Sequence, residues 1–140
     1  AIIDNPPGTG DEPLTVLQTI PNIDAVMMVT TPNVVSQEDV LKCVRMVNML
    51  NVENIGLIEN MAYYICPHCG EKLHIFGEGD GESFSEEMAI EYFGDLPLTE
   101  KVSDSPNQDG VVSTLDPDGE VSKRFTEIVK QIGDDFFKEE

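Results

Sequence analysis

The sequence predicts an α/β fold in which a doubly wound, mostly parallel sheet is covered by helices on both faces. Short apolar stretches typical of buried strands alternate with segments whose apolar residues recur at helical spacing. Polar residues follow the apolar stretches, and open α/β sheets bind ligands beyond the carboxyl ends of their strands. We therefore expect three to five strands, a ligand site at one edge of the sheet, and a small hairpin insertion carrying a C-x-x-C pair.

The amino-terminal segment is predicted to contribute two strands and a helix. Residues 1–3, Ala-Ile-Ile, are expected to form a short buried strand, which suggests the back half of a larger sheet. The helix over 11–20 is expected to begin at Asp11 as its N-cap, with Pro13 in the first turn, where a missing N–H costs nothing. The nearly continuous apolar run over 24–32 is typical of a strand buried on both faces.

The next segment is predicted to form a helix over 36–50 and a strand over 54–60. Ser36 and Asp39 have the spacing of a capping box at the helix start. The apolar stripe of this helix consists of Val40, Val44, Val47 and Leu50. Cys43 lies on the same stripe, so we expect it to act as a small buried hydrophobic residue.

The remaining elements are shorter, apart from the last helix. Residues 61–76 are hairpin-like, and a helix over 83–92 and a strand over 93–98 follow. A further strand is expected over 110–115. The last helix, over 121–136, has an apolar face made of Val121, Phe125, Ile128, Ile132 and Phe136.

Composition excludes several classes of function. The chain has 140 residues, enough for one domain, and its 27 acids and 8 bases give a net charge of −19, which argues against nucleic acid and anionic lipid as partners. It has no apolar run of 18 residues and no secretory leader, so we expect neither a membrane span nor secretion. Three cysteines without a leader fit a reducing, cytoplasmic setting.

The stretch Cys66-Pro67-His68-Cys69-Gly70 has the chemistry of a metal knuckle. Two intervening residues let both sulfurs face one ion, and Gly70 permits a left-handed exit from the turn. Two thiolates supply only half of a four-ligand site, and three completions remain open. A second copy of the chain supplies the other two thiolates, His74 closes the site within one chain, or the pair is a redox dithiol or unoccupied. His68 is expected to face solvent.

The opening stretch AIIDNPPGTGD has a second possible site. Asp4 at the tip of a strand is placed as nucleotide hydrolases place a magnesium-binding acid, and glycines at positions 8 and 10 let backbone N–H groups approach a phosphate. The alternative is a strand-to-helix turn that binds nothing.

Several stretches together resemble one family. IIDNPPGTGDEPLTVLQ, NIGLIENMAYYICPHCGEKLHIFGEGDG and FGDLPLTEKVSDSPNQDGVV follow the pattern of Mrp/ApbC-type ATPases, iron–sulfur cluster carriers of the MinD/ParA-like deviant-Walker group. The resemblance covers nearly the whole chain in the right order. It implies that residues 1–140 are the carboxyl-terminal part of one P-loop NTPase domain, with 62–82 as a metal-knuckle insertion and linker.

The resemblance also implies roles for single residues. Asp4 would hold a magnesium ion through water, Asn60 would bond the adenine edge of ATP, and Pro97 would pack near the base. Three residues would form the switch that senses the γ-phosphate: Gly8, Thr9 and Gly10. Cys66 and Cys69 would bind a 4Fe–4S cluster, or zinc in its place, between two copies of the chain.

The implied function is an ATP-dependent carrier or scaffold that acts as a homodimer and transfers its cluster to apo iron–sulfur proteins. The departure from the family is the missing P-loop, because no Gly-Lys-Ser or Gly-Lys-Thr occurs in the sequence. The glycines of 77–81 cannot replace it, since their acidic neighbours would repel phosphate, and we expect a mobile linker there. We therefore expect this chain alone to be inactive as an ATP hydrolase. The alternatives are a non-catalytic metal-knuckle interaction domain, with zinc or iron–sulfur, and a MinD-like regulatory ATPase.

Overall fold

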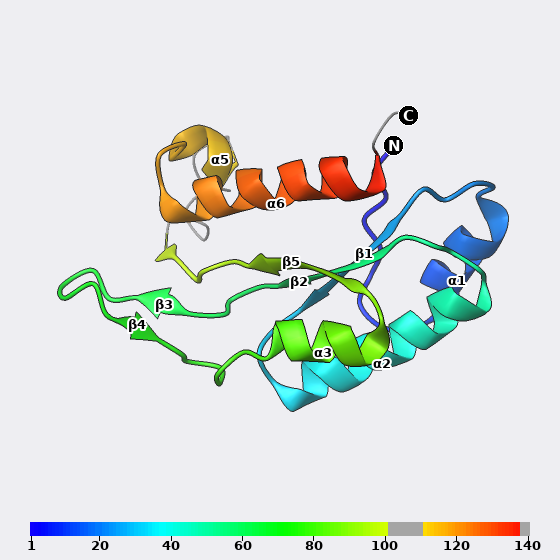
Figure 1. Cartoon of the computed structure of the whole chain (residues 1–140), viewed down its shortest axis with the longest axis horizontal. Coiled ribbons are helices and arrows are strands. Elements are labelled where there is room, and N and C mark those ends of the chain that lie inside the picture. Colours follow the sequence, from blue (N-terminus) through cyan, green and yellow to red (C-terminus); the bar gives the residue numbers. More distant parts are fainter. Residues whose placement is uncertain (101–110, 138–140) are drawn as a thin grey trace.

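The computed structural model describes residues 1–100 and 111–137, and its centre is a parallel sheet in the order β1-β2-β5. The sheet strands are β1 (Val26–Thr30), β2 (Ile55–Glu59) and β5 (Glu91–Asp95). The helices are α1 (Asp11–Thr19), α2 (Val34–Met49), α3 (Gly81–Met88), α5 (Val112–Leu115) and α6 (Glu120–Phe136). Helices α2 and α3 cover one face and α6 covers the other, which confirms the doubly wound α/β class (Figure 1).

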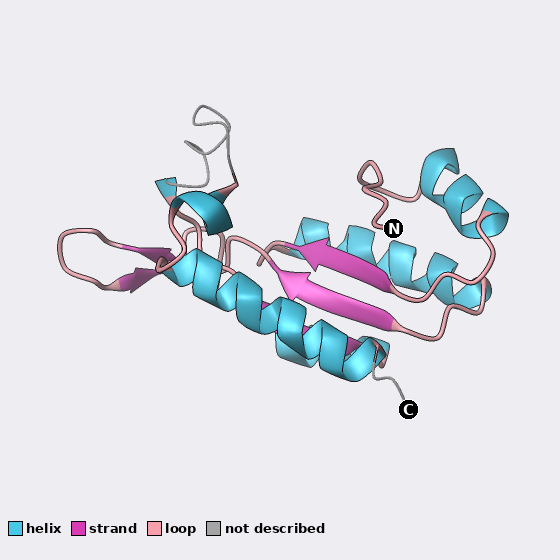
Figure 2. Ribbon diagram, turned by 90° about the horizontal axis from the view of Figure 1, so that it is seen from above, coloured by secondary structure: helices cyan, strands magenta, loops and turns pink. Residues whose placement is uncertain are grey.

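Crossover connections give the sheet its parallel register. Helix α2 joins β1 to β2, and Val26 lies opposite Ile55. A hairpin of β3 (Tyr64–Ile65) and β4 (Lys72–Leu73), followed by α3, joins β2 to β5. The hairpin extends beyond the carboxyl ends of the sheet strands, on the side of the molecule away from α1 (Figures 1 and 2). The insertion predicted from the C-x-x-C pair therefore projects from the edge of an α/β sheet where ligands bind.

Two apolar layers hold the helices on the sheet. The layer under α2 is a buried cluster of Met28, Val40, Val44, Val47, Ile55 and Leu57. It contains three of the four residues of the predicted helical stripe, which is therefore confirmed. On the opposite face Ile128 of α6 is buried, and the rings of Phe93 and Phe136 meet edge to face with centroids 5.0 Å apart.

The predicted strand over residues 1–3 is wrong. These residues form no strand, Ile2 is fully exposed and Ile3 is 48% exposed. The physical reason is the absence of a partner, because a strand needs a neighbour for its backbone groups and β1 pairs only with β2 among the described residues. Strand β1 is consequently an edge strand, and Val29 on it is 58% exposed rather than buried as predicted.

Smaller errors concern the ends of helices. Helix α2 begins earlier than expected, with Asn33 as its N-cap: the Asn33 side chain accepts a hydrogen bond from the backbone N–H of Ser36 at 2.9 Å, so Ser36 and Asp39 do not form the predicted capping box. Likewise Gly10 precedes α1, and Asp11 is its first helical residue. The strand expected over 110–115 is wrong, because helix α5 lies there.

The helix predicted over 83–92 is α3, which ends earlier. Ala89 has a φ of 54°, in the left-handed region that ends helices, and β5 begins two residues later. The last predicted helix is α6. No helix in the described ranges is both long and apolar enough to cross a bilayer.

Leu57 offers a test of the core. It is completely buried, so Leu57→Ala is expected to lower the free energy of unfolding by about 2–5 kcal/mol, through lost apolar contact and the cavity left behind. Urea denaturation followed by circular dichroism measures the change. Leu73→Ala removes the same atoms from a side chain that is 42% exposed, and a loss as large as that of Leu57→Ala would contradict the assignment of the core.

Candidate metal centre and the carboxyl edge of the sheet

The two thiols of the C-x-x-C pair share one tight turn at the tip of the hairpin. The backbone N–H of Gly70 donates to the carbonyl of Cys66 at 2.8 Å, and the N–H of Cys66 donates to the carbonyl of Glu71 at 3.0 Å. Gly70 has a φ of 73°, the left-handed exit expected from the sequence. The backbone therefore holds the cysteines three residues apart on a single turn.

The electrostatics of the turn favour a thiolate at Cys66. Backbone hydrogen bonds from His68 and Cys69, and then one from the Cys69 thiol, lower the pKa of Cys66. Cys66 is partly exposed, Cys69 is exposed, and neither forms a disulfide. Thiolates that are accessible to solvent are ligands for soft metals, and this turn therefore has the properties of half a metal site.

Completion of that site by His74 is contradicted by the structure. The Nδ1 atom of His74 lies 3.2 Å from the carbonyl oxygen of Ala62, and its ring lies against Tyr63. Within residues 1–100 and 111–137, no group of three or more His, Cys, Asp or Glu side chains is arranged to hold a metal ion. A metal held at this turn would therefore need further ligands from outside the described part of the chain.

The hairpin is firmly attached to the loop that follows β5. Ala62 N donates to Leu96 O at 3.0 Å, and Leu98 N donates to Tyr63 O at 2.7 Å. The Tyr63 hydroxyl donates to Glu120 at the start of α6 at 2.9 Å. Burial, with the nearby Glu120 carboxylate, raises the pKa of Tyr63, which therefore stays a neutral donor. These bonds connect the base of the hairpin to β5 and α6 together.

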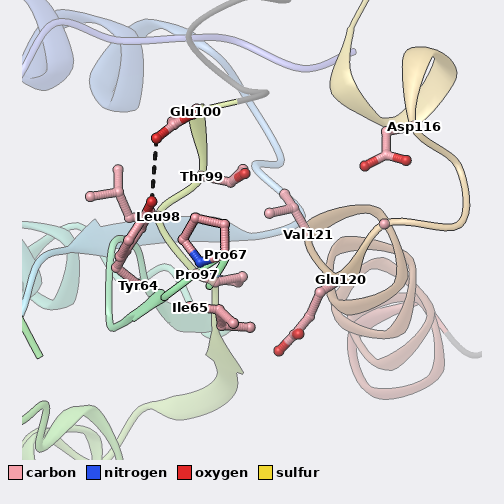
Figure 3. Close-up of a pocket in the computed structure, with 11 residues that line it drawn as sticks. Tyr64, Ile65, Pro67, Pro97, Leu98, Thr99, Glu100, Asp116, Glu120 and Val121 are labelled. Carbon is pink, nitrogen blue, oxygen red and sulfur yellow. Dashed lines mark hydrogen bonds between the residues drawn. The ribbon is translucent and has the colours of Figure 1, made fainter. Parts of the chain in front are cut away.

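A cavity of about 270 Å³ lies between the hairpin and α6 (Figure 3). Pro67 of the metal knuckle and Pro97 of the loop after β5 both line it, and the Tyr64 hydroxyl donates to Glu100 at its rim at 3.3 Å. The cavity holds Pro97, one of the predicted nucleotide residues, but its lining does not include Asn60. The side-chain oxygen of Asn60 accepts a bond from the N–H of Met61 at 2.9 Å.

Glu59, which the sequence analysis did not single out, is the most unusual side chain at the carboxyl edge. It is 3% exposed, and its Oε1 is a buried oxygen with no hydrogen-bond partner in the described part of the chain. Burial raises the pKa of Glu59, Asp95 and Asp80 raise it further, and His74 opposes the change. An acid that ends an apolar strand was the signal that could have identified it.

Residues 77–81, here called the glycine strap, lie against the ends of β1 and β2 and against Tyr92 near the start of β5. A Cβ at Gly77 would come 2.8 Å from the carbonyl oxygen of Pro32, and one at Gly79 would overlap the Glu59 carboxyl. A Cβ at Gly81 would come 2.8 Å from the Tyr92 ring. The sequence analysis expected a mobile linker here, whereas in the structure the glycines allow a close approach between backbone and strand ends.

The predicted switch segment is exposed. Asp4, Gly8, Thr9 and Gly10 are all accessible to solvent, and none of them lines the cavity. One contact connects this segment to the helical layer, because the thiol of Cys43 donates to the carbonyl of Gly8 at 3.5 Å. Cys43 is half-buried against the core, broadly as predicted, and its burial raises its pKa.

The parallel sheet and the helices on both faces define a doubly wound α/β domain with a pair of thiols in a turn beyond its carboxyl edge, the edge at which such sheets bind ligands. A nucleotide-binding protein from Archaeoglobus fulgidus, solved in complex with ADP, superimposes with a TM-score of 0.56 at 28% identity, over 96% of this chain and 49% of that one. The MinD cell division protein of Aquifex aeolicus shares the fold, with a TM-score of 0.59 at 19% identity.

Sequence comparison makes the assignment specific. The profile described as ParA, NUBPL iron-transfer P-loop NTPase, matches residues 1–133, and the chain belongs to this family. An iron–sulfur cluster carrier protein of Methanocaldococcus jannaschii is 45% identical over 94% of this chain and 44% of its own length. The iron–sulfur cluster transfer protein NUBPL of Dictyostelium discoideum is 37% identical over 94% of this chain and 40% of its own length. The chain thus spans less than half the length of these relatives.

The environments of the cysteines predict a difference in reactivity. Near neutral pH, iodoacetamide is expected to alkylate Cys66 about tenfold or more faster than Cys43, because the thiolate is the nucleophile and the two pKa values move in opposite directions. Mass spectrometry of peptides from the reduced, metal-free protein measures both rates. Unfolding in urea is the control and should bring the rates together. Equal rates in the folded protein would contradict the thiolate assignment.

Proposed function

We propose that this protein carries a 4Fe–4S cluster bridged between two copies of the chain and transfers it to apo iron–sulfur proteins. The observation that carries the proposal is the exposed turn with Cys66 and Cys69, which supplies two soft ligands and leaves the others to a partner. The names of the relatives, iron–sulfur cluster carrier and transfer proteins, support the same cargo.

A symmetric pair of copies is the simplest way to complete the site. A two-fold axis through the tips of two hairpins would bring four thiolates together, which suits a 4Fe–4S cluster. The hairpin projects from the body of the domain, so its tip is accessible to a second copy (Figure 2). A cluster held by only two thiolates of each chain, at an exposed position, is also accessible to a recipient protein. The three free thiols fit a reducing, cytoplasmic setting.

We further propose that nucleotide regulates the carrier. Pro97 lies in a cavity that it shares with the knuckle, and Asn60 follows the central strand, so both fit a place near an adenine base. Asp4, Gly8, Thr9 and Gly10 are exposed in this structure, and the 140 residues contain no phosphate-binding lysine loop. The residues present therefore fit ATP and magnesium only in part, and no hydrolytic step is assigned to them.

The soft donor pair also fits one alternative, a non-catalytic interaction domain whose knuckle holds zinc. Soft thiolate ligands bind zinc and iron–sulfur clusters almost equally well. The two functions differ in the metal that the purified protein holds after loading without oxygen, since a carrier should assemble a cluster from iron and sulfide and a zinc domain should not.

Cluster assembly tests the proposed carrier function. After anaerobic reconstitution with iron and sulfide, the protein is expected to show the visible absorption of a cluster, with one 4Fe–4S per two chains in native mass spectrometry. Cys66→Ala and Cys69→Ala each remove one of the two proposed ligands of every chain, and therefore two of the four in the dimer. Either variant should abolish that signal while leaving the circular dichroism spectrum unchanged.

Cys43→Ala is the matched control, because it removes a thiol that lies against the core and away from the turn. It should retain the full cluster. A complete cluster in either knuckle variant, or one cluster held by a single chain, would overturn the bridging arrangement.

A further inference from the structure

The Glu59 side chain, at the end of the central strand, is buried in surroundings that disfavour a charged carboxylate. Its Oε1 is buried without a hydrogen-bond partner in the described residues, and a buried carboxylate in that condition is strongly disfavoured. Gly79 lies against this carboxyl so closely that a Cβ on it would overlap the carboxyl atoms. A neutral carboxyl can tolerate this contact far better than a charged one.

The glycine strap connects Glu59 to the knuckle through the chain itself. The strap follows β4 after only three residues, 74–76, and leads directly into α3. Its glycines lie close to residues of all three strand regions: Pro32 after β1, Glu59 at the end of β2 and Tyr92 near the start of β5. A change in the position of the strap therefore alters how the hairpin is held against the sheet.

We propose that Glu59 is a positioning residue for the knuckle: its uncharged carboxyl lets the glycine strap lie closed over the carboxyl edge of the sheet, and loss of its proton releases the strap. We call this contact between the Glu59 carboxyl and the glycine strap the latch. Its consequence for cluster binding rests on the proposed carrier function, whereas the latch itself does not. Glu59 acts through the strap and touches no cargo.

The charged groups around Glu59 determine whether its pKa is raised or lowered. Asp95 on β5 and Asp80, which precedes α3, disfavour a second negative charge, and His74 after β4 acts against them. Tyr92 on β5 responds to the same charges, since burial and Glu59 raise its pKa, and it stays neutral. Arg124 of α6 forms an ion pair with Asp95 and so relieves part of the repulsion.

These neighbours determine whether the closed strap becomes more or less stable as the pH rises. Because the pKa of Glu59 is raised in the closed state, that state binds the proton more tightly than the open one. Closure is therefore most stable at low pH, and its stability falls as pH rises from the ordinary glutamate range through the raised pKa of Glu59. Most folded carboxyls have the opposite dependence, which makes the effect easy to recognise.

NMR relaxation of the backbone amides in 77–81 tests the latch in the metal-free protein, because it reports whether a segment is ordered even where its residues, as at 77–80, are exposed. The ratio of ordered to released strap should fall by up to about tenfold per pH unit across the titration, the limit for release of one proton. Glu59→Gln keeps the shape without the charge, so the strap should stay ordered at every pH. Glu53→Gln, an exposed acid just before β2, is the matched control and should behave as the unmodified protein.

Two results would overturn the latch: strap order that does not change with pH, or Glu59→Gln that titrates as the unmodified protein does. Gly79→Ala keeps the proposal falsifiable if Glu59→Gln does not fold. The added methyl group overlaps the carboxyl and should leave the strap released at every pH. An ordered strap in Gly79→Ala would contradict the contact on which the latch depends.

Coupling to the knuckle has a separate readout. With Zn²⁺ loaded on the thiols at a pH where the strap is closed, a chelator should remove the metal several-fold faster from Gly79→Ala than from the unmodified protein. Equal removal rates would overturn the coupling. Failure of the unmodified protein to bind Zn²⁺ or a cluster would instead overturn the proposed carrier function, while the relaxation data would still decide the latch.

Discussion

Strand β2 is the constraint on which the rest of the structure depends. It pairs in parallel with β1 on one side and β5 on the other, and Leu57 at its centre is completely buried. Both helical layers pack on the sheet that it organises, so its direction determines which edge holds the three carboxyl ends. The hairpin begins a few residues after β2 ends, and the thiols, Asn60 and Glu59 therefore all lie at or beyond one edge.

The sequence predicted the elements whose stability is local or depends on simple periodicity. The stripe on α2 identified a core layer, the apolar run of β2 identified a buried strand, and the spacing of Cys66 and Cys69 identified the tight turn. Prediction failed at residues 1–3, because apolar character shows a preference for burial but does not supply the neighbouring strand. It also failed at the glycine strap, since the close approach of Gly79 to Glu59 is a tertiary contact without a local signal.

The large excess of acidic residues affects the protonation of the buried Glu59. With 27 acids and 8 bases, most carboxylates in the chain have no basic side chain to pair with, and the surface potential is strongly negative. Arg124 is shared between Asp95 and Glu127, and Lys42 pairs with Asp39 on exposed α2. No ion pair in the described ranges involves Glu59. In this negative potential a buried carboxyl stays neutral to a higher pH than the exposed acids around it.

The negative surface potential also affects the thiol turn at the knuckle. Thiolates add negative charge to an acidic protein, so the turn compensates with backbone N–H groups that point at the sulfur of Cys66 rather than with a lysine or arginine. In the proposed bridged arrangement, four thiolates around iron or zinc leave the centre with a net negative charge, so the surrounding acids oppose association. The metal–sulfur bonds would therefore have to outweigh the repulsion between two negative copies, and without metal that repulsion alone would keep the copies apart.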